Sequence, residues 1–454
     1  MAERSFNLVV PLAHEATAMR TTNTAASQQA RFGAVSRLGN RASDIDSTMD
    51  TSRTLTMPGI STSTTATRTT TTPTTKTEPA PSANGYEHRH ADPSFPELVQ
   101  AYFDCREHKR NTASALAFEE RLEFNLCELH DELTSGAYRP GRSICFVVTR
   151  PKAREVWAAD FRDRIVHHLL YNHVGRQIEA SFIADSCACI PGRGTLYAAK
   201  RLEAKVRSIT ENWSRPAFYL KLDLANFFVS IDKRILYRSL AEQIADPWWL
   251  ALAETILFHD PREDFELRGR PEEIALVPPH KRLGNQPVHL GLPIGNLSSQ
   301  FFANVFLDAL DQHCKHQLRA RHYIRYVDDF LLLHESTDWL NAAHADIEAW
   351  LPAHLGVSLN PAKTILQPVD RGVDFVGHVI KPWHRSTRRR TVHEAVRKVT
   401  VTPAEDLLEV GNSYFGLLRQ AEHSHHDRAM VANALRRRGH SISGDFTKTY
   451  RRAA

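Results

Sequence analysis

The chain has 454 residues, of which 42% are hydrophobic and 24% charged, so it can bury a core without disulfides or metals as staples. Its six cysteines form no CxxC pair, which excludes a zinc ribbon or a disulfide framework and favours a reducing, cytoplasmic location. The longest apolar stretches fall short of the roughly 18–20 residues that span a bilayer, so we expect no membrane anchor. The net charge of +5 is uneven, because residues 381–454 hold 15 Lys and Arg but 7 Asp and Glu.

The first part of the chain lacks the pattern of a folded domain. Residues 51–77 include 14 threonines and almost no large apolar side chain. Such a segment cannot bury enough surface to offset the entropy of ordering its backbone. We therefore predict that residues 1–94 form a disordered, Thr-rich leader.

The following elements alternate between helix and strand. An amphipathic helix that ends at Gly136 is predicted by four leucines at spacings of four, three and four residues. These leucines are Leu122, Leu126, Leu129 and Leu133. An extended segment is expected at 142–150 and a helix at 160–178, and the alternation continues to residue 380. The tail from Glu394 onward is expected to be helical. The alternation thus predicts an α/β or α+β fold, of which we favour α+β.

Acidic residues stand at the ends of two predicted strands. Residues 218–223 alternate apolar side chains and end at Asp223, whereas residues 323–333 predict a hairpin whose turn contains Asp328 and Asp329. Adjacent carboxylates between apolar strands repel each other and lose hydration, unless a cation is present. Each acid alone fits a simpler role, a solvated turn for Asp328 and Asp329 or a helix N-cap for Asp223. Together they favour a metal site.

Magnesium suits such a site, because Mg²⁺ prefers carboxylate oxygens and keeps positions open for substrate phosphates. Two such ions, roughly 3.5–4 Å apart, clamp the attacking and leaving oxygens of a phosphoryl transfer. We therefore expect two Mg²⁺ ions as cofactors, with Mn²⁺ as a substitute.

Segments 218–232 and 326–329 together resemble the two metal-binding motifs of reverse transcriptases, the RNA-directed DNA polymerases. The resemblance extends over roughly Ser114 to Tyr450. It implies a right-hand polymerase of fingers, palm and thumb. The expected domains are fingers at 95–215, a palm at 216–380 with an inserted segment at about 233–290, and a basic helical thumb at 381–454.

The same resemblance implies roles for residues that would hold metal and nucleotide. Asp223 and Asp328 would be the principal metal ligands, with Asp329 and the backbone carbonyl of Leu224 beside them. The nucleotide contacts that it implies are Lys152 and Arg154 on the triphosphate, Phe228 under the sugar, and Ile294 and Gly295 near the base pair. Lys363 would protonate the departing pyrophosphate.

Further residues are expected to contact the template and primer. Arg193 lies in a glycine-rich turn that would approach a template phosphate. Gln300 follows the Gly291–Ser299 segment, and Gly377 lies in a strand–turn–strand similar to the family's primer grip. The basic run Arg388, Arg389 and Arg390 would bind an RNA–DNA duplex.

One departure from the family pattern concerns subtype. Intron-type enzymes carry Gln-Gly and Ser-Pro where this chain has Ile294-Gly295 and Ser299-Gln300. This version resembles the reverse transcriptases of diversity-generating retroelements and some defence-associated relatives. In the former, the missing glutamine accompanies loose base selection at template adenines.

These observations predict an enzyme that synthesises cDNA from an RNA template, using dNTPs and a DNA or RNA primer, in a retroelement of the diversity-generating type. A small accessory protein is a further expected partner. The alternatives are a phage-defence or retron-like reverse transcriptase, a nucleic-acid-binding protein that no longer polymerises, and a two-metal nuclease that uses the same acids.

Overall fold

The structure, a computed structural model, describes residues 92–107, 112–150 and 152–450. The predicted leader therefore lies outside the described residues, apart from its last three positions. The helices are α1 (Phe95–Glu107), α2 (Ala113–Glu119), α3 (Leu122–Ser135), α4 (Phe161–Leu170), α5 (Arg176–Ser181), α6 (Thr195–Ile209), α7 (Phe227–Ser230), α8 (Lys233–Gln243), α9 (Pro247–Phe258), α10 (Leu297–Gln312), α11 (Thr337–His354), α12 (Arg389–Val401), α13 (Leu407–Leu418) and α14 (His425–Arg437).

The strands are β1 (Ser143–Val148), β2 (Arg154–Ala158), β3 (Phe218–Asp223), β4 (Phe265–Leu267), β5 (His322–Tyr326), β6 (Asp329–His334), β7 (Ile365–Pro368), β8 (Val373–Phe375), β9 (His378–Lys381), β10 (His384–Thr387), β11 (Ser441–Ile442) and β12 (Thr449–Tyr450). The mixture of helices with mainly antiparallel sheets confirms the predicted α+β class.

The largest sheet has the strand order β5-β6-β3-β7, and all its neighbouring strands are antiparallel. β5 and β6 form the expected hairpin. β3 lies in the interior of the sheet. Four of its six residues are buried, and only Phe218 and Lys221 are half-buried. The sheet places the ends of β3 and β6 side by side.

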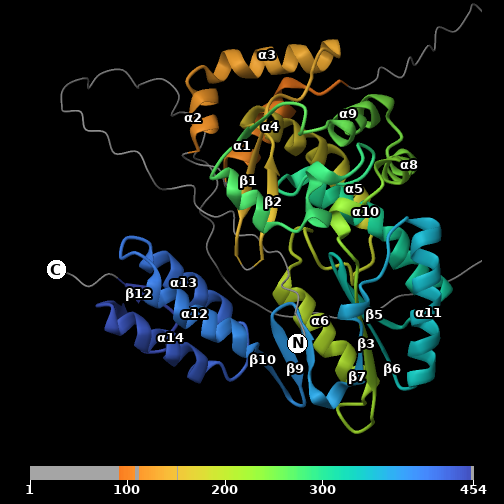
Figure 1. Cartoon of the computed structure of the whole chain (residues 1–454), viewed down its shortest axis with the longest axis vertical. Helices are drawn as coiled ribbons and strands as arrows, with labels where there is room; N and C mark the ends of the chain where they lie inside the picture. The colour runs from red at the N-terminus through yellow and green to blue at the C-terminus, as the bar shows by residue number, and fades with distance from the viewer. Residues whose placement is uncertain (1–91, 108–111, 151, 451–454) are drawn as a thin grey trace, which may run out of the picture. The chain divides into compact units, whose positions relative to one another are not determined.

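Helices cover both faces of this sheet. Figure 1 shows α6 and α11 on opposite sides of β3, β5 and β6. On the α6 side, Ala198, Leu202 and Val206 pack against the sheet in one apolar cluster. On the other side, α10 and α11 join a larger cluster. Because both faces are buried, the register of β3 against β6 is strongly specified.

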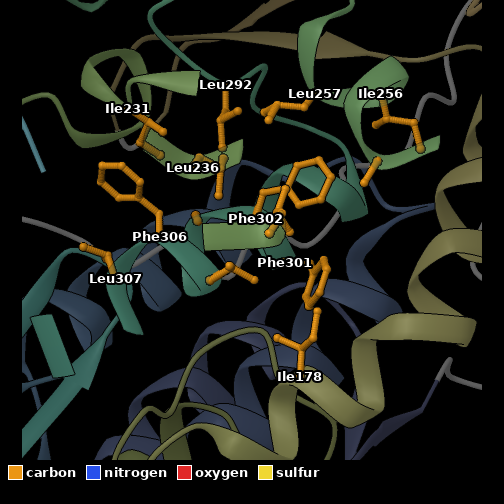
Figure 2. Packing of buried hydrophobic residues seen from close by; sticks show 14 of the residues in the cluster. Ile178, Ile231, Leu236, Ile256, Leu257, Leu292, Phe301, Phe302, Phe306 and Leu307 are labelled. Carbon is orange, nitrogen blue, oxygen red and sulfur yellow. The ribbon is translucent and has the colours of Figure 1, made fainter. Parts of the chain in front are cut away.

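Helix α10 forms the centre of the larger cluster. Phe301, Phe302 and Phe306 are each at most 1% exposed, and Figure 2 shows them among aliphatic side chains that include Leu236 and Leu292. Burying a side chain of this size contributes about 2 kcal/mol relative to leaving it in water. α10 is therefore a rigid support for the loop that precedes it and for the strands that pack on it.

A second sheet has the order β2-β1-β4. β1 and β2 are an antiparallel hairpin, and β4 joins β1 in parallel from the segment expected to be an insertion at 233–290. The expected extended segment at 142–150 is thus confirmed as β1. The pairing with β4 was not predicted, because its three residues are too short to carry a strand pattern.

The C-terminal part begins with the sheet β10-β9-β8, in which β8 and β9 form the strand–turn–strand that was predicted. Three helices follow, α12, α13 and α14, and they share an apolar core of their own. Helix begins at Arg389, five residues before the predicted start. The short hairpin β11–β12 after α14 was missed.

Two negative findings concern the described residues alone. None of their helices is long and apolar enough to cross a membrane. No disulfide joins any of the six cysteines, all of which lie in this part of the chain.

Candidate active site

The three predicted acids lie together where β3 and β6 end. Asp223 is the ladder partner of Asp329, and the Leu224 N–H donates a hydrogen bond of 3.2 Å to the Asp328 carbonyl. Asp223 and Asp329 are each 2% exposed. Residues separated by 105 positions in the sequence therefore share one site.

The turn of the hairpin differs by one residue from the expectation. Val327 and Asp328 form it, whereas Asp329 is already the first residue of β6. Val327 has a φ of 55°, which is unfavourable for a β-branched residue. The turn differs from the expected one because Asp329 pairs with Asp223 in the β3–β6 ladder. Of the two adjacent aspartates, only Asp328 therefore lies in the turn.

Burial and mutual repulsion favour the protonated form of the Asp328 carboxyl. Its pKa is raised to about 7, mainly by desolvation and further by the charges of Asp223 and Asp329. Desolvation also raises the pKa of Asp329, although the Lys221 ammonium opposes this. These are the electrostatic conditions in which a cation binds strongly.

Two lysines neutralise two of the acids. Lys363 Nζ lies 2.6 Å from Asp223 Oδ1, and Lys221 Nζ lies 2.9 Å from Asp329 Oδ2. Within residues 92–107, 112–150 and 152–450, no three His, Cys, Asp or Glu side chains are already arranged as a metal-ligand set. Asp223 and Asp329 are therefore each paired with a lysine.

The donor set nevertheless fits Mg²⁺. It consists of the carboxylate oxygens of neighbouring aspartates, which are the kind of ligand that Mg²⁺ prefers. In addition, the buried Asp329 Oδ1 has no hydrogen-bond partner in the described part of the chain. An orphaned buried carboxylate oxygen is costly, so a bound cation would satisfy it.

The β1–β2 hairpin brings a cation to the same site. Arg154, the first residue of β2, is partly buried, and desolvation lowers its pKa, while the charges of Asp328 and Asp223 act in the opposite direction. Arg154 therefore lies within electrostatic reach of both acids. Lys152 is half-buried in the turn between β1 and β2.

A comparison with protein families decides what this arrangement belongs to. The family model described as reverse transcriptase (RNA-dependent DNA polymerase) matches residues 150–380, just over half of the chain. The chain belongs to the reverse transcriptase family. This is a family of nucleotidyltransferase enzymes, and the matched region includes all three acids and Arg154.

Two solved structures of telomerase are similar to parts of this chain. A telomerase from Candida albicans, in complex with a TWJ fragment of telomeric RNA, is 12% identical with a TM-score of 0.40, covering 71% of this chain and 60% of that chain. An apo telomerase from Candida tropicalis, truncated from its C-terminal domain, is also 12% identical with a TM-score of 0.40, covering 57% and 59%. This chain thus spans about three fifths of the length of those chains. No curated protein matches it.

Phe228 lies beside the site but not in an extended segment. It follows Phe227 in the helical turn α7, and the two rings meet edge to face with centroids 5.4 Å apart. Phe227 is buried against Phe306, whereas Phe228 is half-buried. The Phe228 carbonyl accepts a hydrogen bond of 2.8 Å from the Leu292 N–H.

The segment before α10 lies against β2. The Trp157 N–H donates to the Ile294 carbonyl at 2.7 Å, and Asn296 bonds to the backbone of Trp157 and Ala159. Gly295 has a φ of 130°, and a Cβ there would lie 2.8 Å from Val156 Cγ1. Glycine is therefore required where the loop and the strand approach each other.

The predicted template and primer residues are more dispersed. Arg193 donates to the carbonyls of Ile183 and Ser186, at 2.9 and 2.8 Å, so its guanidinium holds its own loop. Gln300 is exposed in the first turn of α10, and Gly377 lies in the β8–β9 turn with a φ of 88°.

The basic run at the start of α12 is divided. Arg388 is 9% exposed and forms an ion pair with Asp374 of β8. Arg389 and Arg390 are exposed. Arg388 thus joins the start of α12 to the β8–β9 hairpin.

Sequence reasoning missed two residues that surround the acids, Lys221 and Arg325. Lys221 lies diagonally opposite Asp329 across the β3–β6 ladder, and Arg325 is 1% exposed. The sequence did contain a sign of both residues. Lys221 interrupts the apolar strand β3 two positions before Asp223, and Arg325 interrupts β5 two positions before the turn. The partners of these two residues depend on how the strands pair, which the sequence of one strand does not reveal.

Proposed function

We propose that this reverse transcriptase synthesises cDNA from an RNA template at the site formed by Asp223, Asp328 and Asp329. The observation that carries the proposal is the pairing of β3 with β6, which sets the acids of two distant segments side by side. An RNA template, a DNA or RNA primer and dNTPs are the partners of this activity.

Magnesium ions bound by Asp223, Asp328 and the Leu224 carbonyl, with Asp329 adjacent, would activate the primer 3′-hydroxyl and stabilise the charge that develops on the α-phosphate. The chain's own cations complete the electrostatics. Arg154, with Lys152 in the same hairpin, would neutralise the triphosphate. Lys363 holds a proton at Nζ next to Asp223 and would donate it to the departing pyrophosphate.

We also propose residues that contact the sugar and base of the incoming nucleotide. The Phe228 ring would lie under the sugar and exclude a 2′-hydroxyl, and its position is fixed through its carbonyl by Leu292. Ile294 and Gly295 would face the new base pair from the loop that lies on β2. Arg193, Gln300, Gly377, Arg389 and Arg390 would follow the template–primer duplex through its phosphates, with Arg388 supporting them.

The test is incubation of the purified full chain with primed poly(rA), labelled dTTP and Mg²⁺. Extension of the primer supports the proposal. Retention of the primer without extension would indicate a binding protein on a polymerase fold, and shortening would indicate a nuclease. An Asp223→Asn variant is the control for a contaminating polymerase.

We further propose that the enzyme serves a retroelement of the diversity-generating type, in the cytoplasm and with a small accessory protein. The support is the Ile294-Gly295 and Ser299-Gln300 version of the loop. This subtype predicts that cDNA copied from a defined template has errors concentrated at template adenines. Errors spread evenly over the four bases would favour the phage-defence or retron-like alternative.

We propose domain limits from the sequence, although the sheet β10-β9-β8 extends across the limit between residues 380 and 381. The fingers would extend over 95–215, the palm over 216–380 and the thumb over 381–454. The insertion at about 233–290 would lie within the palm sequence, although its strand β4 pairs with β1 of the fingers.

A further inference from the structure

Arg325 is a buried charge next to the catalytic turn. It is the fourth residue of β5, 1% exposed, and the chain enters the Val327–Asp328 turn two residues later. A charged side chain is seldom buried unless its position needs it, because desolvation costs several kcal/mol per ion. The contacts of its guanidinium group show what it holds.

The guanidinium joins three parts of the protein. Its main partner is Asp311 of α10, whose two carboxylate oxygens each lie 2.7 Å from an Arg325 nitrogen. Another nitrogen donates to the Val327 carbonyl at 3.2 Å, inside the catalytic turn. A third contact, of 2.8 Å, reaches Ser186 Oγ in the loop before α6. Lysine has no planar fork with which to make all three contacts.

The contact with Val327 bears directly on Asp328. The positive φ of Val327 is a strained conformation that persists only where surrounding contacts hold it. Here Arg325 holds the carbonyl of Val327, and the Leu224 N–H holds the carbonyl of Asp328. The turn is thus fixed from both strands, and the direction of the Asp328 carboxylate depends on it.

The contact with Ser186 reaches the loop that carries Arg193. The backbone of Arg325 also binds this loop, since its N–H donates to the Asp185 carbonyl at 2.9 Å and its carbonyl accepts from the Cys187 N–H at 3.0 Å. Arg193 in turn donates to the Ser186 carbonyl. One residue therefore contacts both the turn of the metal ligand and the loop proposed to hold the template.

We infer that Arg325 is a positioning residue that sets the orientation of Asp328 through Val327 and ties it to the 183–193 loop. The inference rests on the proposed function for its kinetic consequence, but its structural part stands separately. A buried ion pair is often no more stable than well-packed apolar residues of the same volume. The pair with Asp311 is thus explained by geometry better than by stability.

The test replaces the buried pair by apolar residues. Because Tyr323 donates to Asp311 Oδ1 at 2.6 Å, the triple variant Tyr323→Phe, Arg325→Met, Asp311→Leu is compared with Tyr323→Phe alone. The single variant is the matched control, since it alters the same cluster without touching the turn. Circular dichroism and the urea midpoint establish folding, and primer extension gives kcat and the KM for dNTP.

We expect the triple variant to fold as stably as the control, with kcat lower by about 100-fold and the KM for dNTP changed by less than about threefold. A kcat within about threefold of the control would overturn the inference. Should the triple variant not fold, Arg325→Lys replaces it. This variant keeps the cation and is expected to lose at least about tenfold in kcat, and full activity in it would overturn the inference.

Hydrogen exchange separates this inference from the proposed function. Peptides that cover 322–334 and 183–194 are expected to exchange faster in the variant than in Tyr323→Phe, whether or not the wild type polymerises. Unchanged exchange in both peptides would overturn the inference even in an active enzyme. An inactive wild type with faster exchange in the variant would instead contradict the proposed function alone.

Discussion

Lys363 Nζ and Asp223 Oδ1 are 2.6 Å apart, although the two residues are 140 positions apart in the chain. The lysine proposed to protonate pyrophosphate thus contacts a carboxylate proposed to bind metal. A cation that binds Asp223 must compete with this ion pair. Metal binding at Asp223 is therefore linked to separation of the Lys363 ammonium from this carboxylate, which lets the ammonium reach the substrate.

This link predicts opposite effects of Lys363→Met on binding and on catalysis. Without the competing ammonium, Mn²⁺ should bind the substrate-free protein more tightly, as measured by titration with paramagnetic detection. Loss of the general acid should lower kcat by about 100-fold. Lys200→Met, at an exposed position of α6, is the control, and a weaker Mn²⁺ affinity in Lys363→Met would contradict the link.

Lys221 is expected to stabilise the folded protein as well as to hold the Asp329 carboxylate in place. Its ammonium binds Asp329 and also donates to the Asp374 carbonyl at 3.0 Å. Lys221→Met should lower the free energy of unfolding by about 3 kcal/mol, because it leaves a buried carboxylate unpaired. Adding Asp329→Asn should restore most of this loss in urea denaturation. Equal destabilisation in the single and double variants would show that Lys221 acts through packing.

The raised pKa of Asp328 predicts how stability depends on pH without metal. Since the pKa is about 7 in the folded protein and lower in the unfolded chain, the folded state holds an additional proton between these values. Stability in EDTA should therefore fall as pH rises from about 4 to about 7. Mg²⁺ should oppose the fall, since it stabilises the ionised carboxylate.

Urea midpoints at several pH values, with and without Mg²⁺, measure this effect. Asp328→Asn cannot ionise and should have a flatter profile over the same range. If the variant and the wild type lose stability in parallel, other groups are responsible for the dependence.

Phe228 is predicted to select the sugar. Phe228→Val removes the ring that would block a 2′-hydroxyl and should admit ribonucleotides in single-nucleotide extension. Because Phe227 is a buried core residue, Phe227→Leu is the comparison that should alter stability but not sugar choice. Unchanged discrimination in Phe228→Val would remove this role.

The regular elements around the site were readable from the sequence. Alternating apolar residues placed β3 and the β5–β6 hairpin correctly, because these strands are long and flanked by turns. The spaced leucines and Gly136 likewise predicted α3 and its end, where Gly136 adopts a φ of 73°. Local periodicity is sufficient for such elements.

The remaining features depend on tertiary contacts. Phe227 and Phe228 do not continue the strand that ends at Asp223, because the left-handed Asn226, with a φ of 49°, precedes the helical turn α7. The pairing of Arg325 with Asp311 depends on how α10 packs against β5. The exact turn residues depended on the β3–β6 register. None of these is encoded in a short sequence window.

The most direct test of the account is the location of Mn²⁺ in crystals of the protein with primer, template and a non-hydrolysable dNTP, by anomalous diffraction. We predict peaks that contact both Asp223 and Asp328, with Lys363 displaced from Asp223 toward the phosphates. Mn²⁺ peaks that touch neither acid, with the Lys363–Asp223 pair intact in the loaded complex, would contradict it.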